Sequence, residues 1–354
     1  MPSIDSLQNI IMGKEKMVTD DEMPTLLDPL TIGSLTVRNR LVLPPMRSRK
    51  ASPDGYITDE IVKHYSDRAE GAGTAIVEHT YVADWGRTLI QLGVSDDRFI
   101  PGLKQLAQAI HAKGAAAVLQ INHAGSHSSS EVLGRLPTAP SAIKNPREEK
   151  GEVPKPMTKD DIQEVVNAFA GAAKRAVAAG FDGVEVHCAH GFLLSEFISP
   201  ITNKRTDEYG GSTRNRIRLP EEVVKAIRKV VDEDCPIFCR FPSTDSMPGG
   251  LELLESIVMA KRLFASGVNV LDVSGGVGGI EPPSPREQGF FVPHAEAIKK
   301  ATGAIVVGVG GIVDPWFADD IVRKGRVDLV AVGRPLLKDP TWFMKAIQTL
   351  KTKR

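Results

Sequence analysis

The sequence predicts a closed (β/α)8 barrel, and three observations carry the prediction. From residue 41 onward, eight short apolar runs alternate with amphipathic stretches of helical period. The runs are apolar at consecutive positions, which is typical of parallel strands buried on both faces by flanking helices. Eight strand–helix units also fit a sheet that closes on itself rather than an open, doubly wound sheet.

Each predicted strand is bounded by Gly or Pro, and a candidate helix follows it. The predicted strands are residues 41–46, 74–80, 115–123, 183–190, 237–242, 270–276, 304–311 and 329–335. The predicted helices are residues 60–70, 102–113, 159–179, 221–231, 251–266, 294–301, 317–324 and 340–350. The wide spacing after the third and fourth strands predicts enlarged loops at about 124–158 and 191–212, over the carboxyl-terminal mouth where barrel enzymes keep their chemistry.

The segment before the first strand divides into two parts. Residues 26–37 predict a short hairpin with Gly33-Ser34 as its turn, expected to plug the bottom of the barrel. Residues 1–24 are polar and charged without strong periodicity, and we expect them to form an appended, partly ordered arm. Residues 25–354 are then one large domain.

Composition excludes several classes of protein. Lys+Arg and Asp+Glu both number 44, so the net charge is zero and the broad basic surface of a nucleic-acid binder is missing. No apolar run approaches the ~20 residues of a membrane span, and the amino terminus lacks the pattern of a signal peptide. Three cysteines are too few for a disulfide framework and indicate a reducing, cytoplasmic setting. Oligomerisation is left open.

Polar side chains gather where the predicted strands end. Any one of them could be a satisfied residue of the barrel rim, but a whole series needs a ligand or a hydrogen-bond network to offset its desolvation. The series consists of Arg47, His79, Gln120, His123, His187, His190 and Arg240.

Glycines end the seventh and eighth strands, where barrels commonly bind phosphate through backbone N–H groups. Gly310-Gly311 and Gly333-Arg334 leave the backbone open to phosphate oxygens, and the arginine adds a charge. Two tight turns would explain the same glycines. Their position after both strands favours a phosphate site, and the first strand lacks the GxGxxG of a Rossmann site.

Several motifs resemble those of the old yellow enzyme family of FMN-dependent ene-reductases, over most of the chain from Leu27 to Trp342. The most specific is Arg205-Thr206-Asp207-Glu208-Tyr209-Gly210-Gly211-Ser212 with Asn215-Arg216. The others are NRLVLPPM (39–46), QINHAG (120–125) and HCAHGFLL (187–194) followed by Glu196-Phe197.

The resemblance implies FMN as cofactor and a hydride transfer from NAD(P)H, through the flavin, to an electron-poor acceptor such as an α,β-unsaturated carbonyl, quinone or nitro compound. His187 and His190 are the implied catalytic pair, which grips the acceptor oxygen, and Phe192 and Arg49 are the other implied substrate contacts. The implied FMN-binding residues are Pro44, Pro45, Met46, Arg47, His79, Gln120, Arg240, Gly310, Gly311, Gly333 and Arg334.

Three positions depart from the family pattern. Arg47 stands where the family often has Cys or Thr, and Arg49 where a subset has a substrate-contacting Tyr. Phe192 replaces the Tyr that ordinarily donates the proton completing alkene reduction, and a phenyl ring has no proton to give. We therefore expect flavin binding and hydride acceptance, with the reduction of simple enones lacking its usual acid.

Three alternatives remain at the sequence level. A flavin-dependent substrate dehydrogenase or isomerase would tolerate the loss of the tyrosine. A metal-dependent hydrolase could bind zinc through His123, His187 and His190, but Gln120, Arg240 and the glycines would then have no task. A flavin-binding sensor would carry the cofactor without turnover.

Overall fold

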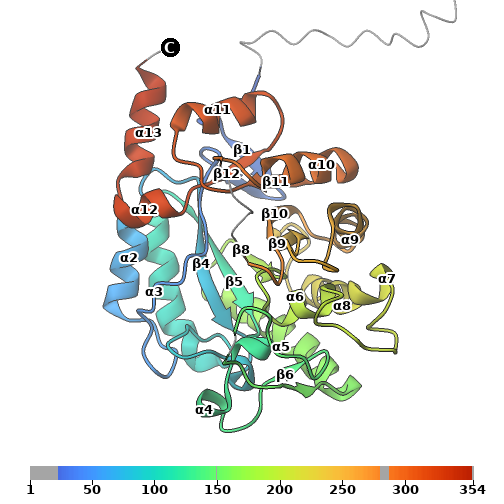
Figure 1. Ribbon diagram of the computed structural model, residues 1–354. Coiled ribbons are helices and arrows are strands. Elements are labelled where there is room, and N and C mark those ends of the chain that lie inside the picture. Colours follow the sequence, from blue (N-terminus) through green and yellow to red (C-terminus); the bar gives the residue numbers. More distant parts are fainter. Residues whose placement is uncertain (1–22, 149, 280–286, 353–354) are drawn as a thin grey trace, which may run out of the picture.

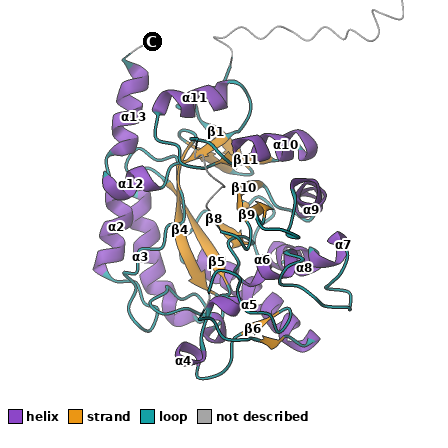
Figure 2. Ribbon diagram, viewed as in Figure 1, coloured by secondary structure: helices purple, strands orange, loops and turns teal. Residues whose placement is uncertain are grey.

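A closed barrel of eight parallel strands forms the centre of the computed structural model, which describes residues 23–148, 150–279 and 287–352 (Figures 1 and 2). Strand β12 pairs with β3 and closes the ring, so the predicted fold class is confirmed. All eight predicted strands are present, some of them shorter than predicted. They are β3 (Leu41–Leu43), β4 (Thr74–Tyr81), β5 (Ala116–Asn122), β8 (Gly183–His187), β9 (Ile237–Thr244), β10 (Val270–Gly275), β11 (Ile305–Gly308) and β12 (Leu329–Ala331).

Helices surround the barrel, as the purple ribbons around the orange strands in Figure 2 show. The eight predicted helices are confirmed with small changes at their ends, in part because capping side chains set the boundaries: Thr158 and Asp161 form a capping box that starts α5. These helices are α2 (Asp59–Ala69), α3 (Ile100–His111), α5 (Lys159–Ala178), α8 (Arg218–Arg228), α9 (Leu253–Ala265), α10 (Val292–Thr302), α11 (Pro315–Arg323) and α13 (Trp342–Lys351). None of the described helices is both long and apolar enough to cross a bilayer.

Short elements in the loops over the barrel mouth were not predicted, because they are too brief to show a period. The α-helical pieces are α4 (Ser130–Leu133), α6 (Leu193–Ile198), α7 (Thr213–Arg216) and α12 (Arg334–Lys338). The 3₁₀ turns are η2 (Asp84–Gly86), η3 (Asp97–Phe99) and η4 (Gly125–His127), and β6 (Thr138–Ala139) pairs in parallel with β7 (Lys155–Pro156).

The predicted hairpin closes the amino-terminal end of the barrel. Strands β1 (Leu30–Ile32) and β2 (Leu35–Val37) pair through a turn in which Gly33 has a φ of 61°. Ile32 and Val37, each 1% exposed, pack against interior residues near the starts of the barrel strands, including Val42 and Phe238. In Figure 1 this hairpin lies at the opposite end from α4 and β6, so the mouth faces away from it.

The predicted amino-terminal arm lies almost entirely outside the described residues, which begin at Met23. The chain that follows the arm is attached to the barrel, since the Leu26 N–H donates to Asp319 Oδ1 of α11 at 2.8 Å.

We predict that Ile32→Ala lowers the free energy of unfolding by about 2–4 kcal/mol, because it leaves a cavity in the plug that the surrounding strands cannot fill. Chemical unfolding of parent and variant measures the difference. Thr36→Ala changes an exposed residue of the same hairpin and should alter stability by less than about 0.5 kcal/mol. Equal effects of the two changes would show that the hairpin is not a packed plug.

Candidate active site

A buried polar layer crosses the inside of the barrel and is formed by residues within four neighbouring strands. Gln120 of β5 donates through Nε2 to Glu185 Oε2 of β8 at 2.7 Å. Arg240 of β9 pairs with Asp272 of β10, and its Nη2 lies 3.4 Å from Ser274 Oγ. The four charged or amide side chains are at most 6% exposed, so their polar atoms must find hydrogen-bond partners in the layer instead of water.

The layer contains two carboxyl groups, Glu185 and Asp272, but only one positively charged group, Arg240. Burial raises the pKa of Glu185 well above its ordinary value, and the neighbouring Asp272 raises it further. Burial also raises the pKa of Asp272, although Arg240 opposes this shift. Glu185 is therefore held neutral while Arg240 and Asp272 form the ion pair.

Two atoms of this layer have no hydrogen-bond partner among the described residues: Gln120 Oε1, an acceptor, and Arg240 Nε, a donor. Unpaired buried polar atoms are costly, and an acceptor and a donor left together indicate a ligand that offers both donors and acceptors. The pyrimidine edge of a flavin is such a ligand, so the layer fits the group that the sequence implied.

A cluster of aromatic side chains lies beside the layer. Phe192 contacts three histidine rings, with centroid distances of 5.1 Å to His79 and 4.7 Å to both His127 and His187. The His187 and His190 rings are 5.2 Å apart and nearly perpendicular. The structure thus brings together the predicted pair, Phe192 and His79.

Hydrogen bonds orient the two histidines of the pair. The Ala189 N–H donates to His187 Nδ1 at 3.3 Å, so the proton of the neutral ring is assigned to Nε2. His190 has a φ of 62° and places its Nε2 2.7 Å from Ser274 Oγ. Burial, followed by neighbouring positive groups, lowers the pKa of both rings well below the ordinary range. Both are neutral at pH 7.

His79 is held on the far side of Phe192. Gln91 Nε2 lies 2.8 Å from its Nδ1, and Gln91 Oε1 accepts from the Thr88 N–H at 2.7 Å. Burial lowers the pKa of His79 to about 3, so this ring is also neutral. Nothing in the sequence pattern pointed to Gln91.

The predicted glycines meet the first-strand motif at one corner of the mouth. Gly310 and Gly311 have φ values of 127° and 65°, which favour glycine. A Cβ on Gly311 would lie 3.3 Å from Arg334 Nη2, and one on Gly333 would lie 3.1 Å from Met46 Sδ. The next contact of Gly333 is Pro44 Cγ at 3.5 Å, and Pro45 lies between these two motif residues. This corner is closely packed, since a Cβ on Gly310 would lie only 2.9 Å from the backbone nitrogen of Phe290, and it has no room for side chains at the glycine positions.

The two unusual arginines lie on the segment after this motif. Arg47 is exposed and donates to the Leu89 carbonyl, while the next residue, Ser48, donates its N–H to Glu78 Oε2 at 2.9 Å. Arg49 is exposed and has a φ of 58°, a strained conformation for a residue with a Cβ. A flavin contact of Arg47 and a substrate contact of Arg49 remain predictions.

The alternative zinc site does not converge. His123 accepts from the Gly125 N–H through Nδ1 at 3.1 Å, and its ring packs on Trp85 at 4.5 Å rather than on the histidine pair. Within the described ranges, no three His, Cys, Asp or Glu side chains are placed to hold a metal ion.

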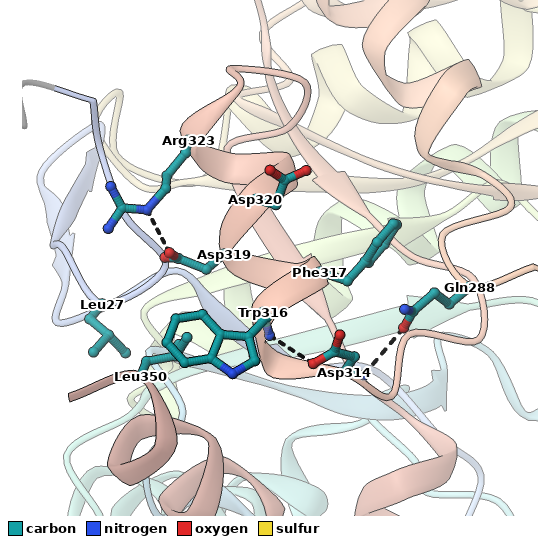
Figure 3. A pocket seen from close by; sticks show the side chains of 9 residues that line it. All are labelled: Leu27, Gln288, Asp314, Trp316, Phe317, Asp319, Asp320, Arg323 and Leu350. Carbon is teal, nitrogen blue, oxygen red and sulfur yellow. Dashed lines mark hydrogen bonds and ion pairs between the residues drawn. The ribbon is translucent and has the colours of Figure 1, made fainter. Parts of the chain in front are cut away.

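A cavity of about 610 Å³ lies elsewhere, on α11 outside the barrel. Figure 3 shows Trp316, Asp319 and Arg323 on one side of it, with Leu27 and Leu350 beside them. None of the strand-end residues lines it, so we place the chemistry at the mouth instead.

Glu196 of α6 is a buried acid that the sequence motif contained without a stated task. It is 1% exposed, and both the N–H and the hydroxyl of Ser126 donate to it. These bonds do not compensate for burial, which raises its pKa from 4.5 to about 8. The protein therefore holds this carboxyl protonated near neutral pH.

The fold and the mouth together define a flavin-dependent oxidoreductase on a (β/α)8 barrel. Comparison with known proteins gives the family: residues 25–353 match the NADH:flavin oxidoreductase / NADH oxidase family. The chain belongs to this family, is of the old yellow enzyme type and uses FMN. It passes hydride from a nicotinamide through the flavin to an acceptor.

Two curated relatives illustrate the match. The chain is 41% identical over 331 residues to an NADPH dehydrogenase of Geobacillus sp. (strain WCH70), covering 92% of this chain and 95% of the relative. It is also 41% identical over 331 residues to an NADH oxidase of Thermoanaerobacter brockii, covering 91% of this chain but only 50% of that relative. The chain therefore spans nearly all of the first relative and half of the second.

Comparison with solved structures agrees with this family assignment. The old yellow enzyme homologue of Zymomonas mobilis has a TM-score of 0.81 at 27% identity, covering 92% of this chain and 93% of its own. Morphinone reductase has a TM-score of 0.81 at 29% identity, covering 94% and 91%. A 2-naphthoyl-CoA reductase complex has a TM-score of 0.87 at 30% identity and covers 92% of this chain but 52% of its own.

We predict that Glu196 makes the parent lose stability as the pH rises from about 4.5 to about 8. A carboxyl whose pKa is higher in the folded state binds more protons there, so its stabilising contribution is complete below pH 4.5 and is lost as pH passes through about 8. Glu196→Gln keeps the shape without the charge. Urea unfolding at several pH values should show the parent falling relative to the variant across this window; parallel profiles would contradict the buried acid.

Proposed function

We propose that the mouth residues reduce an electron-poor alkene, quinone or nitro compound with hydride from NAD(P)H. The observation that carries this is the neutral histidine pair, His187 and His190, set beside a buried polar layer with unpartnered atoms. Two neutral imidazoles can donate hydrogen bonds to one acceptor oxygen without the solvation that a charged group needs.

The residues that would hold FMN divide between the layer and the glycine corner. Gln120 offers an amide with both donor and acceptor to the pyrimidine edge, and Arg240 offers a permanent positive charge. Gly310, Gly311, Gly333 and Arg334 would hold the phosphate, and Pro44, Pro45, Met46, Arg47 and His79 would contact the ring system. When bound, FMN supplies the hydride at its N5 position.

The histidine pair would act on the acceptor. Donation from His187 Nε2 and from the His190 ring to a carbonyl oxygen draws electron density away from the conjugated double bond. Negative charge that develops on the oxygen during hydride transfer is then stabilised by donors already in place. Phe192 and Arg49 would shape the remaining wall of the acceptor site.

A substrate dehydrogenase or isomerase is the second candidate, and Phe192 is the observation that favours it. A dehydrogenase that gives up a hydride from a C–H bond to the flavin protonates no carbon, so it does not need an acid at this position.

Rapid mixing separates these functions. We expect NADPH or NADH to bleach the flavin, and 2-cyclohexenone or a quinone to restore its colour in a second mixing step. The first step reports hydride acceptance and the second reports acceptor reduction. A flavin that is bleached but is reoxidised by neither of these acceptors, nor by a nitro compound, would rule out the proposed function.

We predict that His187→Ala and His190→Ala each weaken the binding of phenols, which mimic an acceptor oxygen over the flavin, by about tenfold or more. Loss of one hydrogen bond to a phenolate costs about 1.5–3 kcal/mol. Absorbance titration with p-hydroxybenzaldehyde measures the dissociation constants, and the FMN content should stay near that of the parent. If the double variant binds the phenol as tightly as the parent, the pair has only a structural task.

We also propose a reducing, cytoplasmic location, supported by the free thiols of Cys188, Cys235 and Cys239, two of them buried.

A further inference from the structure

Alkene reduction needs a proton as well as a hydride, and no tyrosine of this chain lies near Phe192 to supply it. The chain has four tyrosines, all within the described residues. Tyr65 and Tyr81 are buried in the core, Tyr209 donates to Glu222 Oε2 at 3.0 Å, and Tyr56 packs on Phe99. A tyrosine from another loop therefore cannot replace the missing hydroxyl.

A histidine takes the space next to Phe192 instead. His127, in the 3₁₀ turn η4, packs its ring 4.7 Å from the Phe192 ring at an angle of 38°. Its side chain is 14% exposed, so it lies at the edge of the aromatic cluster rather than in the core. It follows the QINHAG motif by two residues, and nothing in that pattern marked it.

Both ring nitrogens of His127 face oxygens. Nδ1 lies 2.9 Å from Glu148 Oε1, and Nε2 lies 3.0 Å from the His190 carbonyl oxygen. A carboxylate and a carbonyl only accept hydrogen bonds, so both contacts are satisfied together only when the imidazole carries two protons. The site thus favours the imidazolium of His127, in contrast to the neutral rings of His79, His187 and His190.

We propose that His127, oriented and charged by Glu148, is the acid that protonates the acceptor's α carbon in place of the tyrosine. This inference rests on the proposed function. Hydride from the reduced flavin forms the C–H bond at the β carbon, and the alkene electron pair moves to give an enolate. The enolate then takes the Nε2 proton at its α carbon, which restores the carbonyl and leaves His127 neutral.

The proton can be replaced from solvent. The Glu148 side chain is 41% exposed and holds the other nitrogen, so a proton can return along this carboxylate after each turnover. Its backbone is fixed by a bond from the Glu148 N–H to the Asn145 carbonyl at 3.1 Å. The remaining acid nearby, Glu196, is 1% exposed and engaged by Ser126.

The histidines of the binding pair are unsuited to this step. Both are held neutral, and giving up a proton would make either an imidazolate. They are also needed as donors to the acceptor oxygen at the moment the enolate forms. His187 and His190 therefore bind the acceptor while His127 donates the proton, because their surroundings differ.

His127→Gln tests the proposal in the two half-reactions. A positioned general acid contributes about 10²–10⁴-fold, so we expect 2-cyclohexenone reduction to slow by at least 100-fold. Flavin reduction by NADPH and reduction of a quinone, which needs no carbon protonation, should stay within about threefold of the parent. FMN content and melting temperature establish that the variant is folded.

A matched control is available on the outside of the barrel. His111 of α3 lies 2.8 Å from Asp182 Oδ2, a second histidine–carboxylate contact remote from the mouth. His111→Gln should leave both acceptor rates unchanged. Adding Phe192→Tyr to His127→Gln should restore enone reduction at least tenfold, because it returns a hydroxyl acid to the family position.

Glu148→Gln gives an independent measurement. It removes the carboxylate that faces Nδ1 of His127 at 2.9 Å, so we expect enone reduction to slow while quinone reduction stays within about threefold of the parent. A merely structural role of Glu148 would slow both reactions alike.

Each outcome decides something. An unchanged enone rate in His127→Gln overturns the proposal in favour of water, and an equal loss with the quinone shows a structural effect. A parent that reduces quinones but no enone also overturns it, because His127 then donates nothing. A parent whose reduced flavin passes hydride to neither acceptor refutes the proposed function itself, and the inference falls with it.

Discussion

The buried ion pair between Arg240 and Asp272 is the interaction on which the arrangement of the mouth depends. The two residues lie opposite each other in the register of β9 and β10, so the sheet itself brings them together. Removing one partner from such a pair leaves an uncompensated buried charge and typically costs about 3–5 kcal/mol. From this pair, contacts continue through Ser274 to the His190 ring and from the His190 carbonyl to His127.

The two ends of the barrel differ in the kind of side chain that fills their interior. At the amino-terminal end, Ile32 and Val37 of the hairpin complete an apolar layer that needs no ligand. Toward the carboxyl-terminal end, the lumen contains groups that the described part of the chain leaves unpaired, such as Gln120 Oε1 and Arg240 Nε. The first end stabilises the fold by burial, and the second reserves hydrogen-bonding capacity for the cofactor.

Sequence patterns predicted the elements whose periodicity extends over many residues and failed for contacts between distant loops. Eight strands and eight helices were recognisable because their apolar positions repeat. The contact between His127 and Glu148 joins residues 21 apart within one irregular loop, and no period marks either of them. Gln91 and Ser126 escaped for the same reason, since their tasks are defined by His79 and Glu196 across the fold. The roles of Arg47 and Arg49 are still predictions from resemblance.

Phe192, which lacks the hydroxyl of a tyrosine, also influences the charge states of the histidines around it. Its phenyl ring covers His79 and His187, and burial is the largest cause of their lowered pKa values. A tyrosine at this position would bring a polar hydroxyl into the same contacts and reduce that desolvation. The phenyl ring therefore favours neutral donors at His79 and His187, while the two oxygens that face the ring nitrogens of His127 favour a cation. One apolar side chain thus separates the group that binds the acceptor oxygen from the group that can release a proton.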